Sequence, residues 1–176
     1  KKIPVGAGLG GGSSDSAFTL KALNNLFELN ISSDELKSIS KELGSDCPFF
    51  IDSTSKYCTG RGEIMQNLNV DLSDLYLKMI YPSLHISTQK AYSLIKNYVP
   101  LQSFKNLDET SVSEWRDQLR NSFEDPLFME YPELKKIKEN LYEEGAKYAS
   151  MSGSGSTIFG LFEKKPDYSS NLPFSY

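Results

Sequence analysis

Five glycines fall within seven positions near the start of this chain of 176 residues, in the stretch Pro4-Val5-Gly6-Ala7-Gly8-Leu9-Gly10-Gly11-Gly12-Ser13-Ser14. Glycine adopts positive φ at little cost and lets a ligand approach the backbone closely. Apolar side chains recur behind it at helical spacing, which predicts a helix over about residues 15–29. A glycine-rich loop that opens a helix presents unpaired N–H groups and the positive end of the helix dipole. This stretch, which we call the glycine segment, therefore predicts a phosphate-binding site.

Other interpretations of the glycine segment fit its spacing less well. A Walker loop needs Lys directly before the Ser or Thr that follows its last glycine, and Gly12 stands in that place. The dinucleotide pattern G-x-G-x-x-G is satisfied from Gly6 to Gly11, but Pro4 interrupts the short stretch before it and Glu28 lies inside the predicted helix. A flexible linker would lack the helix that follows. The dinucleotide and linker interpretations stay open as weaker alternatives.

Three segments of the chain, in order, resemble one known family. The stretch Ile3–Ala17 resembles the phosphate-binding motif of the GHMP small-molecule kinases, Pro-x-Gly-x-Gly-Leu-Gly-Gly-Gly-Ser-Ser-x-x-Ala. Gly44–Phe49 is similar to the family's segment with the catalytic aspartate, and Met151–Ser156 is similar to its small-residue third motif. The first motif is most similar to the branch that uses ATP to phosphorylate the 2-hydroxyl of 4-diphosphocytidyl-2-C-methyl-D-erythritol, in non-mevalonate isoprenoid biosynthesis. Another GHMP kinase, acting on homoserine, mevalonate or a sugar, and a nucleotide-binding module without catalysis remain alternatives.

The resemblance implies roles for individual residues. Asp46 would be the general base that takes the proton of the acceptor hydroxyl, although an Asp before Pro48 also suits a turn cap. Ser13 and Ser14 would bind phosphate, with Ser14 also on Mg²⁺, unless they merely cap the helix. The expected ATP-binding residues are Pro4, Val5, Gly6, Ala7, Gly8, Leu9, Gly10, Gly11, Gly12, Ser13 and Ser14. The expected substrate-binding residues are Thr88, Gly153, Ser154 and Gly155, of which the last three also suit a plain β-turn.

Composition narrows the functional classes. The chain has 19 Lys and Arg against 23 Asp and Glu, a net charge of −4, and no basic cluster that would favour nucleic acid as a partner. It has no run of 18 apolar residues that would predict a transmembrane helix. Cys47, Cys58 and His85 are too few and too scattered for a disulfide framework or a zinc pattern. These features predict a cytoplasmic protein. The resemblance implies a small-molecule substrate, and either a monomer or a homodimer is expected.

The chain begins where a strand would already be feeding the glycine segment, so we expect sequence upstream of Lys1 to be missing. The resemblance implies that a Lys paired with the catalytic aspartate, and side chains that clamp a cytidine ring, belong to that upstream part. Lys1 and Lys2 lie in the strand that leads into the glycine segment and do not fill this role. We therefore expect the chain alone to have little or no kinase activity.

The order of predicted elements indicates an α+β fold with antiparallel sheet. The resemblance sharpens this to a remnant of an S5-like N-terminal domain over residues 1–70 and a ferredoxin-like C-terminal domain over residues 71–176. Ser32 and Glu35 form a predicted capping box, and Pro48 should block continuation of a helix and hold Cys47 extended. A hairpin is expected over residues 57–65, strands over residues 75–81, 148–151 and 157–162, and helices over residues 88–95, from 113 to before Pro126, and 132–144. Residues 100–112 should form a mobile loop, and Leu134, Ile137 and Leu141 should be core.

Overall fold

The computed structural model describes residues 3–60, 62, 64–96, 107 and 109–168. It divides into two compact units, each described here by itself. The N-terminal unit is Gly10–Val70, and the C-terminal unit combines Lys1–Leu9 with Asp71–Tyr176. The glycine segment is therefore shared, since its first part belongs to one unit and the part from Gly10 onward belongs to the other. The expected division into folding domains at residues 1–70 and 71–176 stays a prediction, because compactness does not test independent folding.

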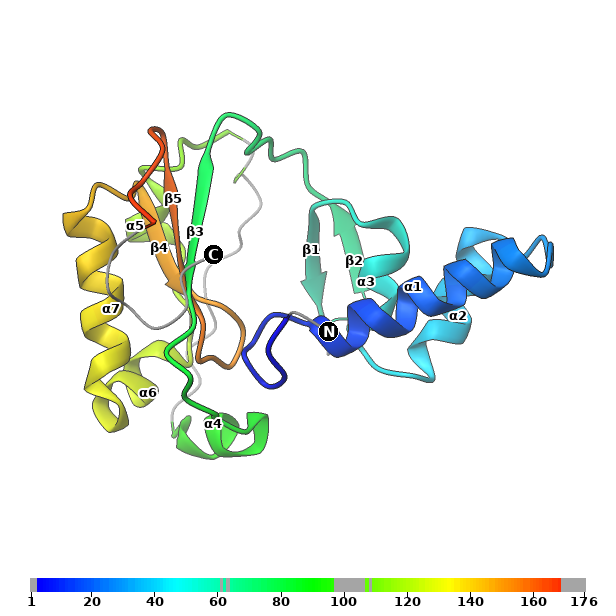
Figure 1. Cartoon of the computed structure of the whole chain (residues 1–176), viewed down its shortest axis with the longest axis horizontal. Coiled ribbons are helices and arrows are strands. Elements are labelled where there is room, and N and C mark those ends of the chain that lie inside the picture. Colours follow the sequence, from blue (N-terminus) through cyan, green and yellow to red (C-terminus); the bar gives the residue numbers. More distant parts are fainter. Residues whose placement is uncertain (1–2, 61, 63, 97–106, 108, 169–176) are drawn as a thin grey trace. The chain divides into compact units, whose positions relative to one another are not determined.

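The N-terminal unit consists of three packed helices and a hairpin (Figure 1). The helices are α1 (Gly11–Leu26), α2 (Ser33–Lys41) and α3 (Cys47–Asp52), and each contacts the other two. Strands β1 (Lys56–Thr59) and β2 (Ile64–Asn67) pair antiparallel, as the sequence predicts. Ala17, Leu36 and Ile51, one from each helix, form the buried apolar centre of this unit.

Local chemistry explains where these helices begin. Helix α1 begins at Gly11, four residues earlier than predicted, because Gly10 takes the left-handed conformation with φ of 62° and turns the chain directly into the helix. The predicted capping box of α2 is confirmed, with Ser32 and Glu35 bonded reciprocally. The expectation that Pro48 holds Cys47 extended is wrong, because Cys47 is the first residue of α3. Pro48 lies in the first turn of α3, where a missing N–H costs no hydrogen bond.

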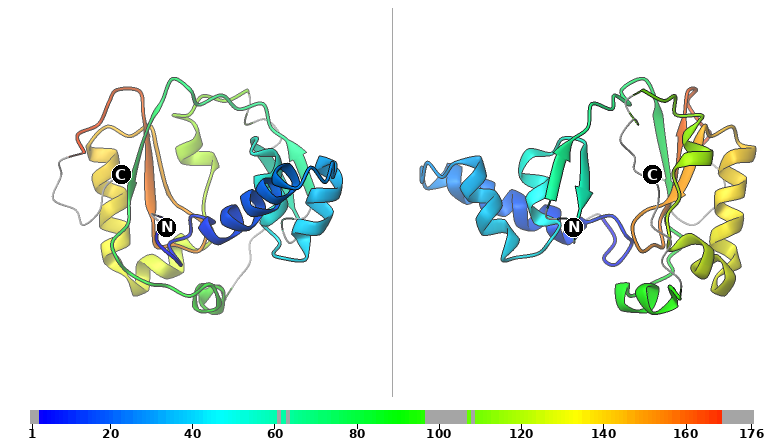
Figure 2. Two further views of the ribbon diagram at one scale, coloured as in Figure 1. Left: turned by 45° about the vertical axis from the view of Figure 1, so that its right-hand side comes forward. Right: turned by 180° about the vertical axis from the view of Figure 1, so that it is seen from behind.

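The C-terminal unit is built on a three-stranded antiparallel sheet in the order β3-β5-β4. Its strands are β3 (Tyr76–Ile80), β4 (Tyr148–Met151) and β5 (Ile158–Phe162), close to the predicted ranges. Helix α7 (Pro132–Glu143) lies along one face and packs on β4 and β5, with α6 (Glu124–Glu130) beside it (Figures 1 and 2). The predicted core positions Leu134, Ile137 and Leu141 are buried there, together with Ile80, Ala149, Ile158 and Phe162 of the sheet.

The remaining helices of this unit show where sequence patterns mislead. Helix α4 (Thr88–Leu94) begins as predicted, with the Ser87 hydroxyl accepting from the Lys90 amide. The predicted helix from residue 113 is only the short α5 (Trp115–Gln118), and Pro126 does not end a helix but lies in the first turn of α6. Proline is tolerated in a first turn for the reason given for α3. Most of the predicted mobile loop 100–112 lies outside the described residues.

The mixed α+β architecture with antiparallel sheets is confirmed. Within the described ranges, the structure has no helix with the length and apolar character needed to cross a bilayer.

Candidate functional site

In the C-terminal unit, the first part of the glycine segment lies directly against the turn of residues 152–157. The Ser152 hydroxyl donates to the Gly8 carbonyl at 2.7 Å, and the Thr157 amide donates to the Ala7 carbonyl at 3.2 Å. The contact is tight, because a Cβ atom on Gly8 would lie 2.1 Å from the carbonyl oxygen of Ser152. Two segments with about 145 residues between them in sequence, both of which resemble family motifs, are thus brought together.

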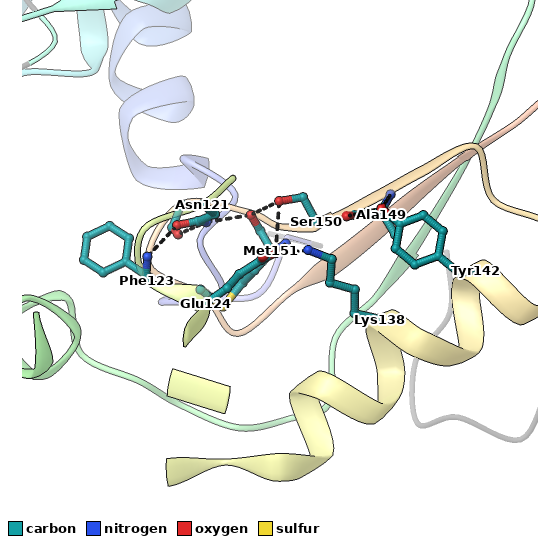
Figure 3. Close-up of polar contacts among 9 residues, drawn as sticks. Asn121, Phe123, Glu124, Lys138, Tyr142, Ala149, Ser150 and Met151 are labelled. Carbon is teal, nitrogen blue, oxygen red and sulfur yellow. Dashed lines mark hydrogen bonds and ion pairs between the residues drawn. The ribbon is translucent and has the colours of Figure 1, made fainter. Parts of the chain in front are cut away.

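The same turn gathers the expected substrate-binding residues. The hydroxyls of Thr88 and Ser154 lie 3.4 Å apart, at the beginning of α4 and at the tip of the turn. The Asn121 amide donates to the carbonyls of Met151 at 2.8 Å and Gly153 at 2.7 Å, and so holds both sides of the turn (Figure 3). Thr88, Gly153, Ser154 and Gly155 therefore share one end of the sheet.

A buried carboxylate supports this turn from below. Glu124, at the beginning of α6, accepts hydrogen bonds from the Met151 amide at 2.8 Å and the Ser150 hydroxyl at 3.1 Å (Figure 3). Its other oxygen pairs with the Lys138 ammonium of α7 at 2.6 Å. Both oxygens of this buried carboxylate are hydrogen-bonded, and breaking any of these bonds would leave a buried polar group without a partner. The network therefore fixes the end of β4 against α6 and α7.

A pocket of about 620 Å³ opens beside the turn. Its walls are largely apolar, and the Tyr92 and Phe123 rings meet edge to face at 5.0 Å. The lining residues are Tyr92, Ile95, Arg120, Asn121, Ser122, Phe123 and Gly153. An apolar pocket with a few polar groups and one cation suits a small organic molecule that carries negative charge.

His85, the only histidine of the chain, packs on the glycine segment within the C-terminal unit. A Cβ atom on Gly6 would lie 2.5 Å from Cε1 of the imidazole ring and 2.7 Å from Nδ1. Gly6 itself has a φ of 70°. The ring therefore closes over a backbone position that only glycine suits.

In the N-terminal unit, the beginning of α1 is arranged to bind an anion. Gly10, as the N-cap, has no side chain to satisfy the amides of the first turn, and the helix runs for 16 residues behind it. Ser13 and Ser14 lie inside this turn rather than before it, so the expectation that one of them caps the helix is wrong. Within the described part of the chain, neither hydroxyl has a protein hydrogen-bond partner. Free amides, two hydroxyls and the helix dipole together suit a phosphate group.

Asp46 is exposed at the N-terminus of α3 in the same unit. Its carboxylate does not cap the helix, and from the described residues it accepts only a long bond, 3.4 Å, from the Ser45 hydroxyl. The alternative that Asp46 is a turn cap is therefore wrong. Phe50, four residues further along α3, contacts Gly10, since a Cβ atom there would lie 3.0 Å from the Phe50 ring. Residues four apart share a helix face, so Asp46 lies on the face of α3 from which the Phe50 ring contacts Gly10, the N-cap of α1.

The charge of Asp46 also reaches the hairpin. Burial raises the pKa of the Cys58 thiol on β1, and the negative charge of Asp46 adds to this rise. A Cβ atom on Gly62 would lie 3.7 Å from Oδ1 of Asp46. The carboxylate thus lies beside the turn of the hairpin, accessible from solvent.

No group of three or more His, Cys, Asp and Glu side chains that could hold a metal occurs among the residues described. Mg²⁺ would therefore fit here in the manner usual for nucleotide sites. There, phosphate oxygens and water supply most of the ligands, and a protein hydroxyl such as that of Ser14 adds one.

Among the residues that sequence reasoning did not find are His85, Tyr92, Arg120, Asn121 and Glu124. Nothing in the local pattern marks them, because their importance lies in the partner they meet across the fold. A weak signal existed for His85 and Tyr92, which flank the predicted Thr88 at three and four residues.

Comparison with known proteins identifies the family to which this chain is similar. The family model described as "GHMP kinases N terminal domain" matches residues 1–53, and the one described as "GHMP kinases C terminal" matches residues 103–169. The 4-diphosphocytidyl-2-C-methyl-D-erythritol kinase of Parabacteroides distasonis is 45% identical over 175 residues, which cover 99% of this chain and 65% of that protein. The enzyme of the same name from Azobacteroides pseudotrichonymphae is 46% identical over 165 residues, which cover 93% of this chain and 62% of that protein.

A crystal structure titled 4-(cytidine 5'-diphospho)-2C-methyl-D-erythritol kinase superposes with a TM-score of 0.79 at 33% identity, over 92% of this chain and 59% of that one. The chain thus spans less than two thirds of the length of these relatives. The two family models match this chain in the order N-terminal then C-terminal, and together they cover more than half of it. The chain therefore belongs to the GHMP kinase family.

Proposed function

We propose that the chain carries the nucleotide-binding and catalytic elements of an ATP-dependent kinase whose acceptor is 4-diphosphocytidyl-2-C-methyl-D-erythritol. The names of the relatives, at 45% and 46% identity, support this acceptor over homoserine, mevalonate or a sugar. The observation that carries the catalytic part is the placement of Asp46. The exposed carboxylate of Asp46, which makes no capping bond to α3, lies on the helix face whose Phe50 contacts Gly10, at a helix N-terminus suited to phosphate.

The chemistry assigned to the N-terminal unit is phosphoryl transfer. The amides of the first turn of α1 and the hydroxyls of Ser13 and Ser14 bind the β- and γ-phosphates of ATP. Asp46 accepts the proton of the 2-hydroxyl while that oxygen forms its bond to the γ-phosphorus. The bond from the γ-phosphorus to the bridging oxygen breaks, and ADP leaves. Bound Mg²⁺, with Ser14 as one ligand, would neutralise phosphate charge.

The acceptor is assigned to the C-terminal unit. Thr88, Gly153, Ser154 and Gly155 would contact it at the turn, with Asn121 holding the turn in shape. The neighbouring pocket of about 620 Å³ suits its organic part, and Arg120 suits its diphosphate. Residues 4–9 of the glycine segment, which belong to this unit, stay assigned to ATP binding by the resemblance alone.

The test is Asp46→Asn in the full-length protein in which this sequence occurs, with ATP affinity and turnover measured separately. Loss of the base should lower kcat by about 10²–10⁴-fold and leave ATP affinity within about twofold. Asp34→Asn is the matched control, because Asp34 is 93% exposed on α2 and pairs only with Lys37 at 3.3 Å. This control should retain full turnover.

Other outcomes would contradict the proposal in distinguishable ways. Unchanged turnover in Asp46→Asn would contradict the assignment of Asp46 as the general base but not the kinase activity itself. Absence of turnover with ATP still bound by the unsubstituted protein would indicate a nucleotide-binding module. Faster phosphorylation of homoserine, mevalonate or a sugar would transfer the chain to another branch of the family.

A further inference from the structure

A cluster of cationic side chains lies in the N-terminal unit, outside the glycine segment. It lines a pocket of about 340 Å³ formed by α2, α3 and the hairpin. We call this the basic pocket, and its lining residues are Lys37, Lys41, Pro48, Asp52, Lys56, Met65 and Asn67. Asp52 is the last residue of α3, whereas Asp46 precedes its first. The two acidic residues are therefore about 9 Å apart along the helix axis, and the basic pocket, which Pro48 of the first turn also lines, contains Asp52 and not Asp46.

The elements present three ammonium groups to this pocket. Lys37 and Lys41 are four residues apart on α2 and so lie on one helix face. Lys56 opens β1 opposite Asn67 of β2, and Met65 is on the same face of the hairpin as Asn67. Lys56 is a built part of the wall rather than a surface residue, since only 8% of its side chain is exposed.

The ion pairs in the basic pocket leave donors unused. Lys37 donates to Asp52 at 2.9 Å and to Asp34 at 3.3 Å, and Lys56 donates to Asp52 at 3.1 Å and to Asn67. Each ammonium has three N–H groups, so each keeps one. Lys41 keeps all three, because the described residues offer it no acceptor.

The lining of the basic pocket carries more positive than negative charge. Three ammonium groups meet one carboxylate in the wall, and the second carboxylate, Asp34, is 93% exposed and pairs with Lys37 from outside. A role limited to tying elements together accounts for Lys37 and Lys56, which bridge α2, α3 and the hairpin. It does not account for Lys41, which lines the pocket and bridges nothing.

We propose that the basic pocket binds the phosphate group of a small phosphomonoester, with Lys37, Lys41 and Lys56 as donors. A phosphomonoester carries nearly two negative charges at neutral pH and three acceptor oxygens, which matches the unused N–H groups. Pro48 and Met65 give the pocket an apolar wall for the organic part of the ligand. None of the three lysines belongs to the glycine segment, to α1 or to the Gly44–Phe49 segment that contains Asp46, so the proposed phosphate donors differ from the groups assigned to the kinase chemistry. Pro48, which lies in that last segment, contributes only to the apolar wall.

The test is a titration of the ¹⁵N-labelled chain with glycerol 3-phosphate at low salt, followed by amide chemical shifts. Saturable shifts are expected at Lys41, Met65 and Asn67. Inorganic phosphate should bind at the same amides, no more tightly than the monoester, and glycerol should cause no shift. Tighter binding of inorganic phosphate would overturn the part of the proposal that assigns an organic ligand.

Two matched substitutions locate the site. Lys41→Gln should weaken binding on the order of tenfold, the effect of one charge-assisted hydrogen bond. Lys135→Gln should leave it unchanged, since Lys135 is 62% exposed on α7 and belongs to the other unit. Lys41 contacts no partner, so its substitution should not alter the unfolding midpoint. Equal affinities in both variants, or shifts confined to Gly11 and Gly12 at the beginning of α1, would overturn the proposal.

Discussion

Gly8 shows how a single residue controls the contact between the glycine segment and the 152–157 turn. Its φ of 76° lies in the left-handed region, and its absent side chain makes room for the carbonyls of Ser152 and Gly155. Gly12 lies four residues further along the same motif, yet a Cβ atom there meets nothing within 4 Å. Packing therefore requires glycine at position 8, whereas at position 12 glycine belongs to the motif without being required by packing.

Gly8→Ala should destabilise the protein by roughly 2 kcal/mol or more, because alanine is strained at this φ and would clash with the turn. Gly12→Ala should be neutral or stabilise by up to about 1 kcal/mol, since it lies in the first turn of α1. Denaturant unfolding of both variants checks this. Equal effects of the two substitutions would contradict the packing argument.

Among the elements of the C-terminal unit, α6, α7 and β4 are joined by a carboxylate rather than by apolar contact alone. Glu124 is only 6% exposed and accepts from an amide, a hydroxyl and an ammonium at once (Figure 3). Such a group stabilises its position only when all its partners are present.

Glu124→Gln should therefore cost about 3–5 kcal/mol of unfolding free energy, because it leaves the Lys138 ammonium without its carboxylate. Glu139→Gln is the matched control on α7, where the ion pair with Lys135 spans 3.7 Å and both side chains are more than half exposed. It should cost less than about 0.5 kcal/mol. Unfolding midpoints give both values, and a Glu124→Gln cost as small as that of the control would show that the network is dispensable.

In the N-terminal unit, Asp52 links α3 to α2 and to β1. The hydrogen bond from Lys37 holds the pKa of this carboxyl below its usual 3.8, and the bond from Lys56 adds to the effect. A lowered folded-state pKa contributes stability above the unfolded-state pKa, near 3.9, and this stability is lost as the pH falls through the folded-state value.

Asp52→Asn should consequently cost about 1 kcal/mol at pH 7, where the carboxylate is charged in both states. The difference between the two proteins should shrink as the pH falls below about 4. Unfolding free energies measured from pH 7 to pH 3 give the difference directly. A difference that stays constant over this range would assign the cost to packing instead of charge.

Over the whole chain, the two units bury apolar side chains to very different extents. The described core of the N-terminal unit has three buried residues, Ala17, Leu36 and Ile51, whereas that of the C-terminal unit has twelve. Because burial of apolar area is the main stabilising contribution, the two units should differ in stability.

We expect the N-terminal unit to unfold at lower denaturant than the C-terminal unit. Trp115, the only tryptophan of the chain, is buried against Tyr148 in the C-terminal unit and reports on it alone. Far-UV circular dichroism also follows α1 and α2. The dichroism transition should therefore begin before the fluorescence transition. Coincident transitions would show that the units unfold together.

Much of the secondary structure could be predicted from local pattern. Helix α7 follows from Pro132 at its first position, Gly145 after its end and the spacing of Leu134, Ile137 and Leu141, and these features act within a few residues. The prediction was wrong for α3 and α6, because proline in a first turn and proline as a breaker look alike in sequence.

The candidate sites could be predicted only where a motif lies in continuous sequence. The glycine segment, Asp46 and the 152–157 turn were found in this way, and their functional roles stay predictions. Asn121 and Glu124 could not be found, because each is defined by partners about 30 residues away along the chain. The basic pocket was missed for the same reason, since lysines on α2 and β1 have no common pattern.

The order of amino acids thus determines what short-range forces decide: where glycine permits a left-handed turn, where a helix is capped, and which face of a helix is apolar. Tertiary structure alone decides the strand order β3-β5-β4, the division of the glycine segment after Leu9, and the carboxylate beneath the turn. The physical reason is chain entropy. Contacts between residues far apart in sequence form only when the whole unit is folded and many of them offset that entropy together.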